Sequence, residues 1–242
     1  MKRIFWIIMG MALALGYTAD AADLGKRILM VVTSHDELKD GKPTGLWVEE
    51  FAVPYELFRS AKHDVTVVSP KGGKAPVDPR SLSDQAAYQP DTLAALERTR
   101  RLAKQDLEEF DAVFFAGGHG TMFDLPENPK VAETVNYFLL QGKPIALVCH
   151  GPAALVGAKT PDGKPVVAGR RLTAFTDDEE RAVELDKAMP FLLEARLREL
   201  GAEFSGGPNF AGRVVVDKNL ITGQNPASSS AAARELLKLL AP

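Results

Sequence analysis

The sequence predicts an α/β fold with a mostly parallel central sheet, and three observations support this. Short apolar runs without polar alternation recur along the chain, as in strands covered on both faces. Segments of helical length with one apolar face separate these runs, as crossover connections require. One run, residues 145–148, leads directly into Cys149 and then into small residues. That order is typical of a nucleophile elbow at the carboxyl edge of a parallel sheet.

The first half of the chain predicts three strands, at residues 27–33, 65–69 and 112–116. A polar loop over residues 34–45 follows the first strand, and we expect it to lie over the site. Residues 70–111 form the least regular segment, with a Gly- and Pro-bearing loop before a helical pattern that carries Leu93, Leu96, Ala103 and Leu107. We expect this segment to be an insertion that caps the site. Helices are predicted at residues 47–61 and 128–140.

The second half of the chain begins with the strand at residues 145–148 and predicts only short elements after it. Further strands are expected within residues 166–175, near Phe204, and at residues 214–216 and 220–222; helices are expected from Asp177 and at residues 191–200 and 232–240. No internal repeat, low-complexity tract or linker divides the chain. We therefore expect residues 22–242 to form one domain.

The first 21 residues have the pattern of a secretory signal. Lys2 and Arg3 precede an apolar stretch over residues 4–15, and residues 19–21 form an A-x-A cleavage site. We expect cleavage after Ala21 and a periplasmic or secreted protein. The apolar stretch is short for a membrane span of about 20 residues, but an uncleaved anchor is the alternative. No later run is long enough to span, so no stable membrane contact is expected after processing.

Charge and cysteine usage exclude several classes of protein. The formal net charge is −3 and no Lys/Arg run is present, so nucleic acid is not an expected partner. The chain has neither paired Cys/His spacing for zinc nor a Gly-rich nucleotide motif, so no metal or cofactor is predicted. Its single cysteine cannot form an internal disulfide. A free thiol kept in an oxidising compartment indicates use.

Cys149 is the candidate nucleophile. Its turn lies at the end of a strand and before Gly151 and Pro152, which suit a first helical turn. Unpaired N–H groups at such a helix start favour a thiolate, so we expect a lowered pKa for this thiol. The alternative is a buried structural cysteine.

Three groups of residues are candidates to assist Cys149. His150 follows it directly and, at a sharp turn, can reach back as the proton-transfer group, with Glu179 or Glu180 orienting it. The loop of Gly117, Gly118 and His119 is a candidate substrate site, in which the amides of Gly118 and His150 form an oxyanion hole.

Glu50 is a further candidate, because it lies near the start of a helix with a buried apolar face. If it points inward, burial raises its pKa, and its protonated carboxyl can hydrogen-bond the Cys149 sulfur or shuttle a proton. We expect one of Glu49 and Glu50 to face solvent.

Four segments, taken together and in order, resemble the DJ-1/PfpI superfamily, and within it the Hsp31-like branch. They are residues 45–54 (GLWVEEFAVP), 116–120 (AGGHG), 148–152 (VCHGP) and 221–228 (ITGQNPAS). The resemblance spans roughly residues 27–240. It implies a flavodoxin-like three-layer sandwich of the class I glutamine amidotransferase type, and a homodimer. The signal-like leader departs from many intracellular relatives, which leaves the physiological substrate open.

The resemblance implies a glutathione-independent glyoxalase of the glyoxalase III or D-lactate dehydratase type, a lyase acting on a small aldehyde. Cys149 would add to methylglyoxal or a related 2-oxoaldehyde, His150 and Glu50 would move protons between its two carbons, and a lactoyl thioester would hydrolyse to the 2-hydroxy acid. The third, acidic member falls near Glu180, with Glu179 as the alternative. Alternatives are a stress-response holdase chaperone that binds unfolded client proteins, a cysteine-dependent small-molecule amidase or hydrolase, and a redox sensor.

Overall fold

The computed structural model of the chain describes residues 25–241, apart from the side chains of residues 84–86. The predicted secretory signal at residues 1–21 therefore lies outside the described residues. Among those described, no helix is long and apolar enough to cross a membrane.

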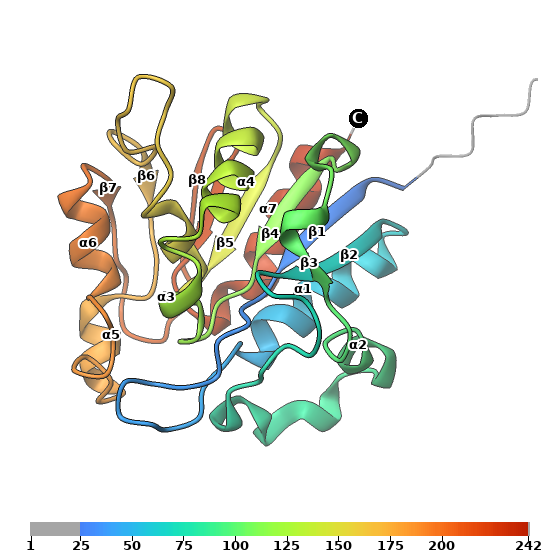
Figure 1. Ribbon diagram of the computed structural model, residues 1–242, viewed down its shortest axis with the longest axis horizontal. Helices are drawn as coiled ribbons and strands as arrows, with labels where there is room; N and C mark the ends of the chain where they lie inside the picture. The colour runs from blue at the N-terminus through green and yellow to red at the C-terminus, as the bar shows by residue number, and fades with distance from the viewer. Residues whose placement is uncertain (1–24, 242) are drawn as a thin grey trace, which may run out of the picture.

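A seven-stranded sheet forms the centre of the molecule and confirms the predicted α/β fold (Figure 1). Six strands are parallel, and only the edge strand β8 runs antiparallel to its neighbour. In spatial order the strands are β3 (Arg100–Arg101), β2 (Asp64–Ser69), β1 (Arg27–Val31), β4 (Ala112–Phe115), β5 (Ile145–Val148), β9 (Leu220–Gly223) and β8 (Val214–Asp217). A separate parallel pair consists of β6 (Arg171–Leu172) and β7 (Glu203–Phe204).

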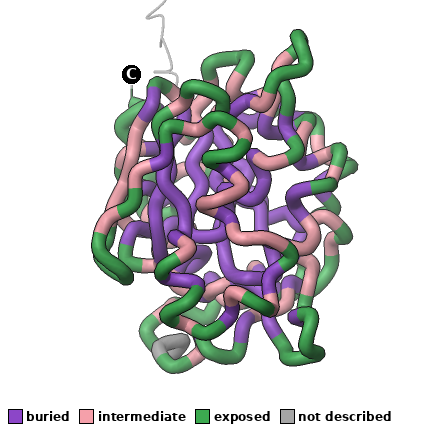
Figure 2. Tube along the Cα trace, turned by 90° about the vertical axis from the view of Figure 1, so that its left-hand side faces the viewer, coloured by how far each residue is buried: buried purple, intermediate pink, exposed green. Residues whose placement is uncertain are grey.

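Helices cover both faces of the sheet, which makes the three-layer sandwich. On one face α1 (Val48–Ser60) and α7 (Ser229–Leu240) pack against each other and enclose a core that contains Phe51, Phe58 and Phe114. On the other face α4 (Pro129–Leu140) and α6 (Leu193–Glu199) border a second core around Phe138 and Phe115. Figure 2 shows the buried strands between these layers. Burial on both faces explains why the strands are continuously apolar in sequence.

The remaining helices are short and lie in the connections. The α-helices are α2 (Pro90–Ala94), α3 (Thr121–Asp124) and α5 (Asp177–Ala182); the 3₁₀ helices are η1 (Pro79–Ala87), η2 (Leu102–Lys104), η3 (Leu107–Glu109), η4 (Gly151–Leu155) and η5 (Pro226–Ser228).

The predicted helix within residues 70–111 is wrong. Instead of one helix, this segment forms short helical turns interrupted by the edge strand β3, which pairs with Val68 and Ser69 of β2. The apolar spacing there reflects separate contacts with the core, because Leu96, Leu102 and Leu107 are buried while Ala103 is exposed. Pairing at the open edge of the sheet overrides the local helical pattern.

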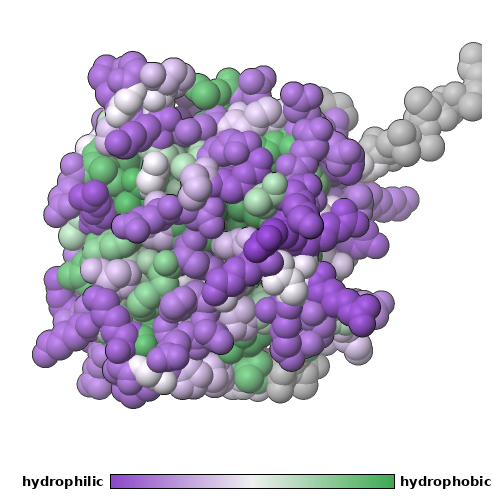
Figure 3. Space-filling view, viewed as in Figure 1, coloured by the Kyte–Doolittle hydropathy of each residue, from purple (hydrophilic) through white to green (hydrophobic). Residues whose placement is uncertain are grey.

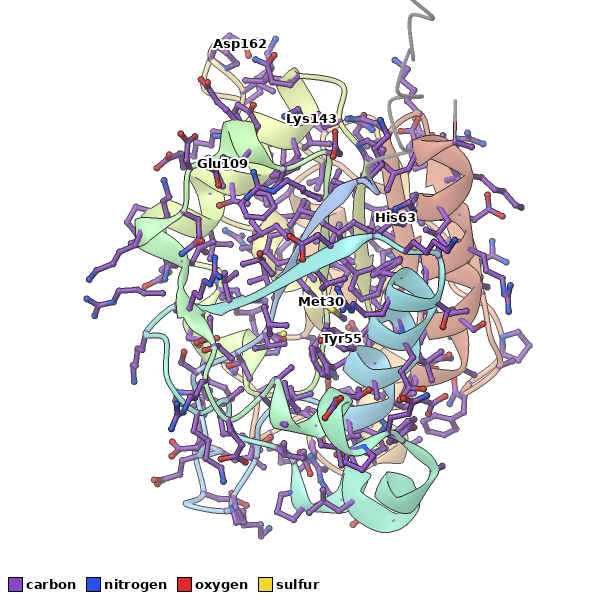
Figure 4. All side chains as sticks on the ribbon, turned by 90° about the vertical axis from the view of Figure 1, so that its right-hand side faces the viewer. Met30, Tyr55, His63, Glu109, Lys143 and Asp162 are labelled. Carbon is purple, nitrogen blue, oxygen red and sulfur yellow. The ribbon has the colours of Figure 1, made fainter. Side chains whose placement is uncertain are left out.

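The amino and carboxyl ends of the strands differ in character. At the amino end, the Lys143 ammonium donates to the Phe110 carbonyl oxygen at 2.7 Å and ties the start of β5 to the start of β4. In Figure 4 the labelled residues Glu109, Lys143 and Asp162 lie toward this end, while Met30 lies on β1 in the middle of the molecule. The chemistry-bearing residues lie at the opposite, carboxyl end of β4 and β5.

Candidate active site

The site is built around a sharp turn at Cys149, directly after β5. Cys149 has a φ of 59°, in the left-handed region that costs a non-glycine residue about 1–2 kcal/mol. Two backbone hydrogen bonds hold this conformation: the Cys149 amide donates to the Gly223 carbonyl at 2.8 Å, and the Phe175 amide donates to the Cys149 carbonyl at 2.9 Å. The side chain is only 4% exposed. This strained and doubly anchored turn is the expected nucleophile elbow.

A hydrogen-bonded relay leads away from the thiol. The Cys149 sulfur lies 3.3 Å from Nδ1 of His150, and His150 Nε2 lies 2.7 Å from Oε2 of Glu180. Burial opposes ionisation of Glu180, but the two neighbouring histidines hold the pKa of this carboxyl well below its usual range. Glu180 is therefore a carboxylate that accepts a hydrogen bond from the Nε2–H group of His150. The lone pair on Nδ1 then faces the thiol, as a general base requires.

The structure decides between the two candidate glutamates. Glu179 turns away from His150 and closes the capping box of α5, where its Oε2 accepts from the Thr176 amide at 2.9 Å. Its other oxygen accepts from the amide of Phe210 and the side chain of Asn225, both at 2.8 Å. The sequence holds a signal for this role, because Thr176 and Glu179 have the spacing of a capping box.

His119 is a second imidazole bound to Glu180. Its Nε2 donates to Oε1 of Glu180 at 2.9 Å, so its Nδ1 accepts from an Nη2 proton of Arg80 at 3.1 Å. Burial, and then the charge of His150, lower the pKa of His119 to about 4. A neutral His119 with this tautomer fixes the second oxygen of the carboxylate that serves His150.

Arg80 reaches this network from η1 in the predicted cap segment, and the sequence pattern gave no signal for it. Its Nε donates to Oδ1 of Asp78 at 2.9 Å, and Thr44 Oγ1 donates to Oδ2 of the same carboxyl at 2.9 Å. Burial opposes ionisation of Asp78, but its hydrogen bonds with Arg80 lower its pKa below the usual value. Arg80 is thus a fixed positive charge at the site.

Glu50 lies behind the nucleophile. Its side chain is fully buried, whereas Glu49 is partly exposed, and its carboxyl lies against the Gly117 backbone and the Cys149 thiol. Neither of its oxygens makes a hydrogen bond of normal geometry. Burial raises the pKa of Glu50 well above its usual value and so favours the protonated carboxyl.

The expected lowering of the Cys149 pKa is wrong. Burial raises the pKa of this thiol well above its usual value, and the nearby Glu50 adds to the effect when it is ionised. The helix that follows is a five-residue 3₁₀ turn, whose N-terminal potential is small beside the cost of burying a charge. The resting group is a thiol, and its proton must be removed during attack.

The loop after β4 presents backbone amides to the site. Gly118 has a φ of +98°, and a side chain there would begin 2.4 Å from the Gly45 carbonyl oxygen. Its amide and that of His150 donate to no protein acceptor within residues 25–241. Two free amides beside the nucleophile form a candidate oxyanion hole. Gly117 instead leaves room for the Glu50 carboxyl, since a Cβ at this position would lie 2.5 Å from Glu50 Oε2.

A cavity of about 240 Å³ opens onto Cys149. Its lining combines charged or reactive side chains with apolar ones. Its lining residues are Trp47, Arg80, Gly118, His119, Cys149, His150, Phe175, Val183, Phe210 and Pro226. The loop over residues 34–45 contributes none of them. A larger, open depression of about 520 Å³ beside β7 and β8 is lined by Arg171, Arg198 and Arg213, among other residues, and does not include Cys149.

His119, His150 and Glu180 also bring three potential metal-ligand atoms within 4.8 Å of one another. The two imidazole–carboxylate contacts, at 2.9 and 2.7 Å, have the length of hydrogen bonds. The Arg80 guanidinium lies against His119 and would repel a cation. The geometry therefore favours proton transfer over metal binding.

The structure thus brings Cys149, His150, Glu180, His119 and Gly118 together around one cavity, with Glu50 behind the thiol. Fold and site together define an α/β protein with a cysteine nucleophile at a strand-to-helix elbow. The chain belongs to the DJ-1/PfpI family, whose model matches residues 45–239.

Similar proteins agree with this assignment over almost the whole chain. The glutathione-independent glyoxalase Hsp3101 of Schizosaccharomyces pombe is 30% identical over 88% of this chain and 95% of its own length. Crystal structures of the Rapid Encystment Protein 24 KDa of Francisella tularensis and of glyoxalase III from Candida albicans superpose with TM-scores of 0.85 and 0.81, at 33% and 25% identity. The first covers 90% of this chain and 100% of that protein, the second 88% and 97%.

Proposed function

We propose that this protein is a glutathione-independent glyoxalase that converts methylglyoxal, or a related 2-oxoaldehyde, to the corresponding 2-hydroxy acid. The observation that carries the proposal is the relay from Cys149 through His150 to Glu180 at a cavity with two free amides. The similarity to the glyoxalases of Schizosaccharomyces pombe and Candida albicans supports the same chemistry.

Addition to the aldehyde is the first step. The Cys149 sulfur bonds to the aldehyde carbon while Nδ1 of His150 takes the thiol proton, so that no buried thiolate needs to persist. The former aldehyde oxygen becomes negative and accepts hydrogen bonds from the Gly118 and His150 amides. Return of the proton to this oxygen gives a neutral hemithioacetal.

An internal proton transfer then completes the redox exchange without an external oxidant. His150 removes the hydrogen on the sulfur-bearing carbon, and the neighbouring keto carbon is protonated through an enediol. The first carbon becomes a thioester carbonyl and the second an alcohol. Water then cleaves the thioester, which releases the 2-hydroxy acid and regenerates the thiol. His150 is the base that reaches the substrate, because it lines the cavity.

Glu50 acts through Cys149 in this scheme, because it is fully buried and is absent from the cavity lining. A protonated Glu50 carboxyl can donate a hydrogen bond to the Cys149 sulfur while the thiol gives its proton to His150. His119 and Arg80 act one step further away, where they hold the Glu180 carboxylate in position.

The decisive experiment follows D-lactate formation from methylglyoxal in the absence of glutathione. We expect Cys149→Ala to lower turnover at least about a thousandfold, because covalent addition is lost. Leu140→Ala is a matched control at an exposed position far from the cavity, and should leave turnover unchanged. Circular dichroism should show both variants folded. Unchanged turnover in a folded Cys149→Ala variant would contradict the proposal.

Nothing in the described surface favours a holdase over an enzyme. Among the described residues, the large exposed apolar side chains are Leu140 on α4, Leu239 on α7 and Phe210 in a loop. The face seen in Figure 3 likewise carries separated apolar patches among hydrophilic residues. A holdase would need a continuous apolar surface, and its action would not depend on Cys149.

A further inference from the structure

Phe210 is an unusual residue at the mouth of the cavity. It lines the cavity, yet it remains 50% exposed, and its φ of 61° lies in the left-handed region that aromatic residues rarely adopt. Glycine would remove this backbone strain, so folding alone does not favour a phenylalanine here. A strained and exposed aromatic residue at an active site indicates that the ring itself is used.

Hydrogen bonds to Glu179 of α5 hold the loop of Phe210 in this position. Its amide donates to Oε1 of Glu179 at 2.8 Å, and Asn225 bridges the same oxygen to the carbonyl of Ala211, with both contacts at 2.8 Å. Glu179 is fully buried and precedes the relay residue Glu180 on α5. The aromatic loop is therefore anchored on the helix that positions the base.

The wall that Phe210 completes is apolar and larger than methylglyoxal requires. It is formed by Trp47, Phe175, Val183, Phe210 and Pro226. The rings of Phe175 and Phe210 have centroids 6.4 Å apart, and Phe175 also packs on His150 at 4.6 Å. The cavity of about 240 Å³ approaches the roughly 300 Å³ at which pockets take drug-sized ligands. The single methyl group of methylglyoxal leaves most of this wall without contact.

We propose that the site takes 2-oxoaldehydes with a bulky apolar substituent, aromatic or branched aliphatic, and that Phe210 is a specificity-determining residue for that substituent. The reactive carbonyls would lie toward Cys149 and the free amides, and the substituent against the apolar wall that includes Phe175 and Phe210. The chemistry in this inference rests on the proposed glyoxalase function, but the binding preference does not.

Kinetics with phenylglyoxal and methylglyoxal test the substrate class. We expect kcat/KM to be about tenfold or more higher for phenylglyoxal, mainly through KM, because the added ring contacts an apolar pocket. Phe210→Ala should lower kcat/KM for phenylglyoxal about tenfold more than for methylglyoxal, and Phe210→Tyr should restore most of the difference. Leu140→Ala should leave both values unchanged. An equal loss for both aldehydes would overturn the role of Phe210.

Ligand binding without turnover separates this inference from the proposed function. The sequence has two tryptophans, so the full chain carrying Trp6→Phe reports only Trp47, which lines the cavity. Acetophenone has no aldehyde group to react. From titrations that follow the quenching of Trp47 fluorescence, we expect its dissociation constant to be at least about tenfold lower than that of acetone. Phe210→Ala should remove that difference.

The outcomes of the two experiments are distinguishable. Tight acetophenone binding with no turnover of either aldehyde would contradict the proposed function and support the apolar specificity. Turnover of methylglyoxal, with neither a phenylglyoxal preference nor tighter acetophenone binding, would overturn the inference and leave the glyoxalase proposal standing.

Discussion

Glu180 organises the site at the scale of single residues. One carboxylate oxygen accepts from His150 and the other from His119, so a single buried carboxylate orients both imidazoles. Burial raises the pKa of the second buried acid, Glu50, and favours its protonated form. The pKa values of two glutamates in the same site are thus shifted in opposite directions, because one has hydrogen-bond donors and the other has none of normal geometry.

Glu50 is expected to reduce stability in exchange for activity. Its pKa is raised in the folded state, so its stabilising contribution is present below the unfolded pKa of about 4.5 and is lost as pH rises toward the folded value. Glu50→Gln should therefore unfold at a higher urea concentration than the wild type at pH 8, and turn methylglyoxal over more slowly. A difference in urea midpoint between Glu50→Gln and the wild type that is the same at pH 8 and at pH 4.5 would contradict this prediction.

His119 makes stability fall with acidification. Its folded pKa of about 4 is below the unfolded 6.5, so the unfolded state gains a proton that the folded state does not, as pH falls through 6.5. This group should lower the free energy of unfolding by about 2 kcal/mol between pH 8 and pH 5. His119→Gln keeps a donor for Glu180 and should show a smaller pH dependence in urea titrations. Parallel pH profiles would show that His119 does not titrate on unfolding.

At the scale of elements, two connections position the chemistry. The turn after β5 fixes Cys149 through its bonds to Gly223 and Phe175, which belong to β9 and to the loop before α5. The capping box of α5 then directs Glu179 to the backbone and leaves Glu180 facing the imidazoles. Short elements suffice for this precision because neighbouring segments satisfy their backbone groups.

The α5 cap predicts a mutation that affects both stability and activity. Thr176→Ala should cost about 1 kcal/mol of stability and also lower kcat, because the start of α5 carries Glu180. Asn128→Ala is the matched control, since Asn128 caps α4 through the amides of Lys130 and Val131, outside the cavity lining. It should lose similar stability with unchanged kcat. Urea unfolding and D-lactate assays of both variants measure the contrast, and equal kcat values would refute it.

At the scale of the whole molecule, the sheet separates two apolar cores and offers its carboxyl edge to the site. The cleaved N-terminal leader, expected from its sequence pattern, and the homodimer, expected from the resemblance, are not tested by these contacts. Both remain proposals. Export would place the thiol in an oxidising compartment, where burial of Cys149 limits its oxidation.

Export predicts a defined mature N-terminus. We expect protein recovered from the periplasm or medium to begin at Ala22, as measured by intact mass. Ala21→Glu, which disrupts the A-x-A site, should leave the leader attached. Full-length chain in the membrane fraction of wild-type cells would instead identify an uncleaved anchor. Light scattering of the mature protein would show whether it is a dimer.

The sequence by itself determined the features that depend on local pattern. Continuous apolar runs predicted the buried strands, and the order of strand, Cys149 and small residues predicted the elbow. Only the tertiary structure decided what depends on distant segments meeting. Examples are Glu180 rather than Glu179 as the relay acid, Arg80 from the cap segment, Phe210 at the cavity mouth, and β3 in place of a helix. The tertiary structure also reversed the expected direction of the Cys149 pKa shift, because burial of the thiol outweighs the positive potential at the start of one short helical turn.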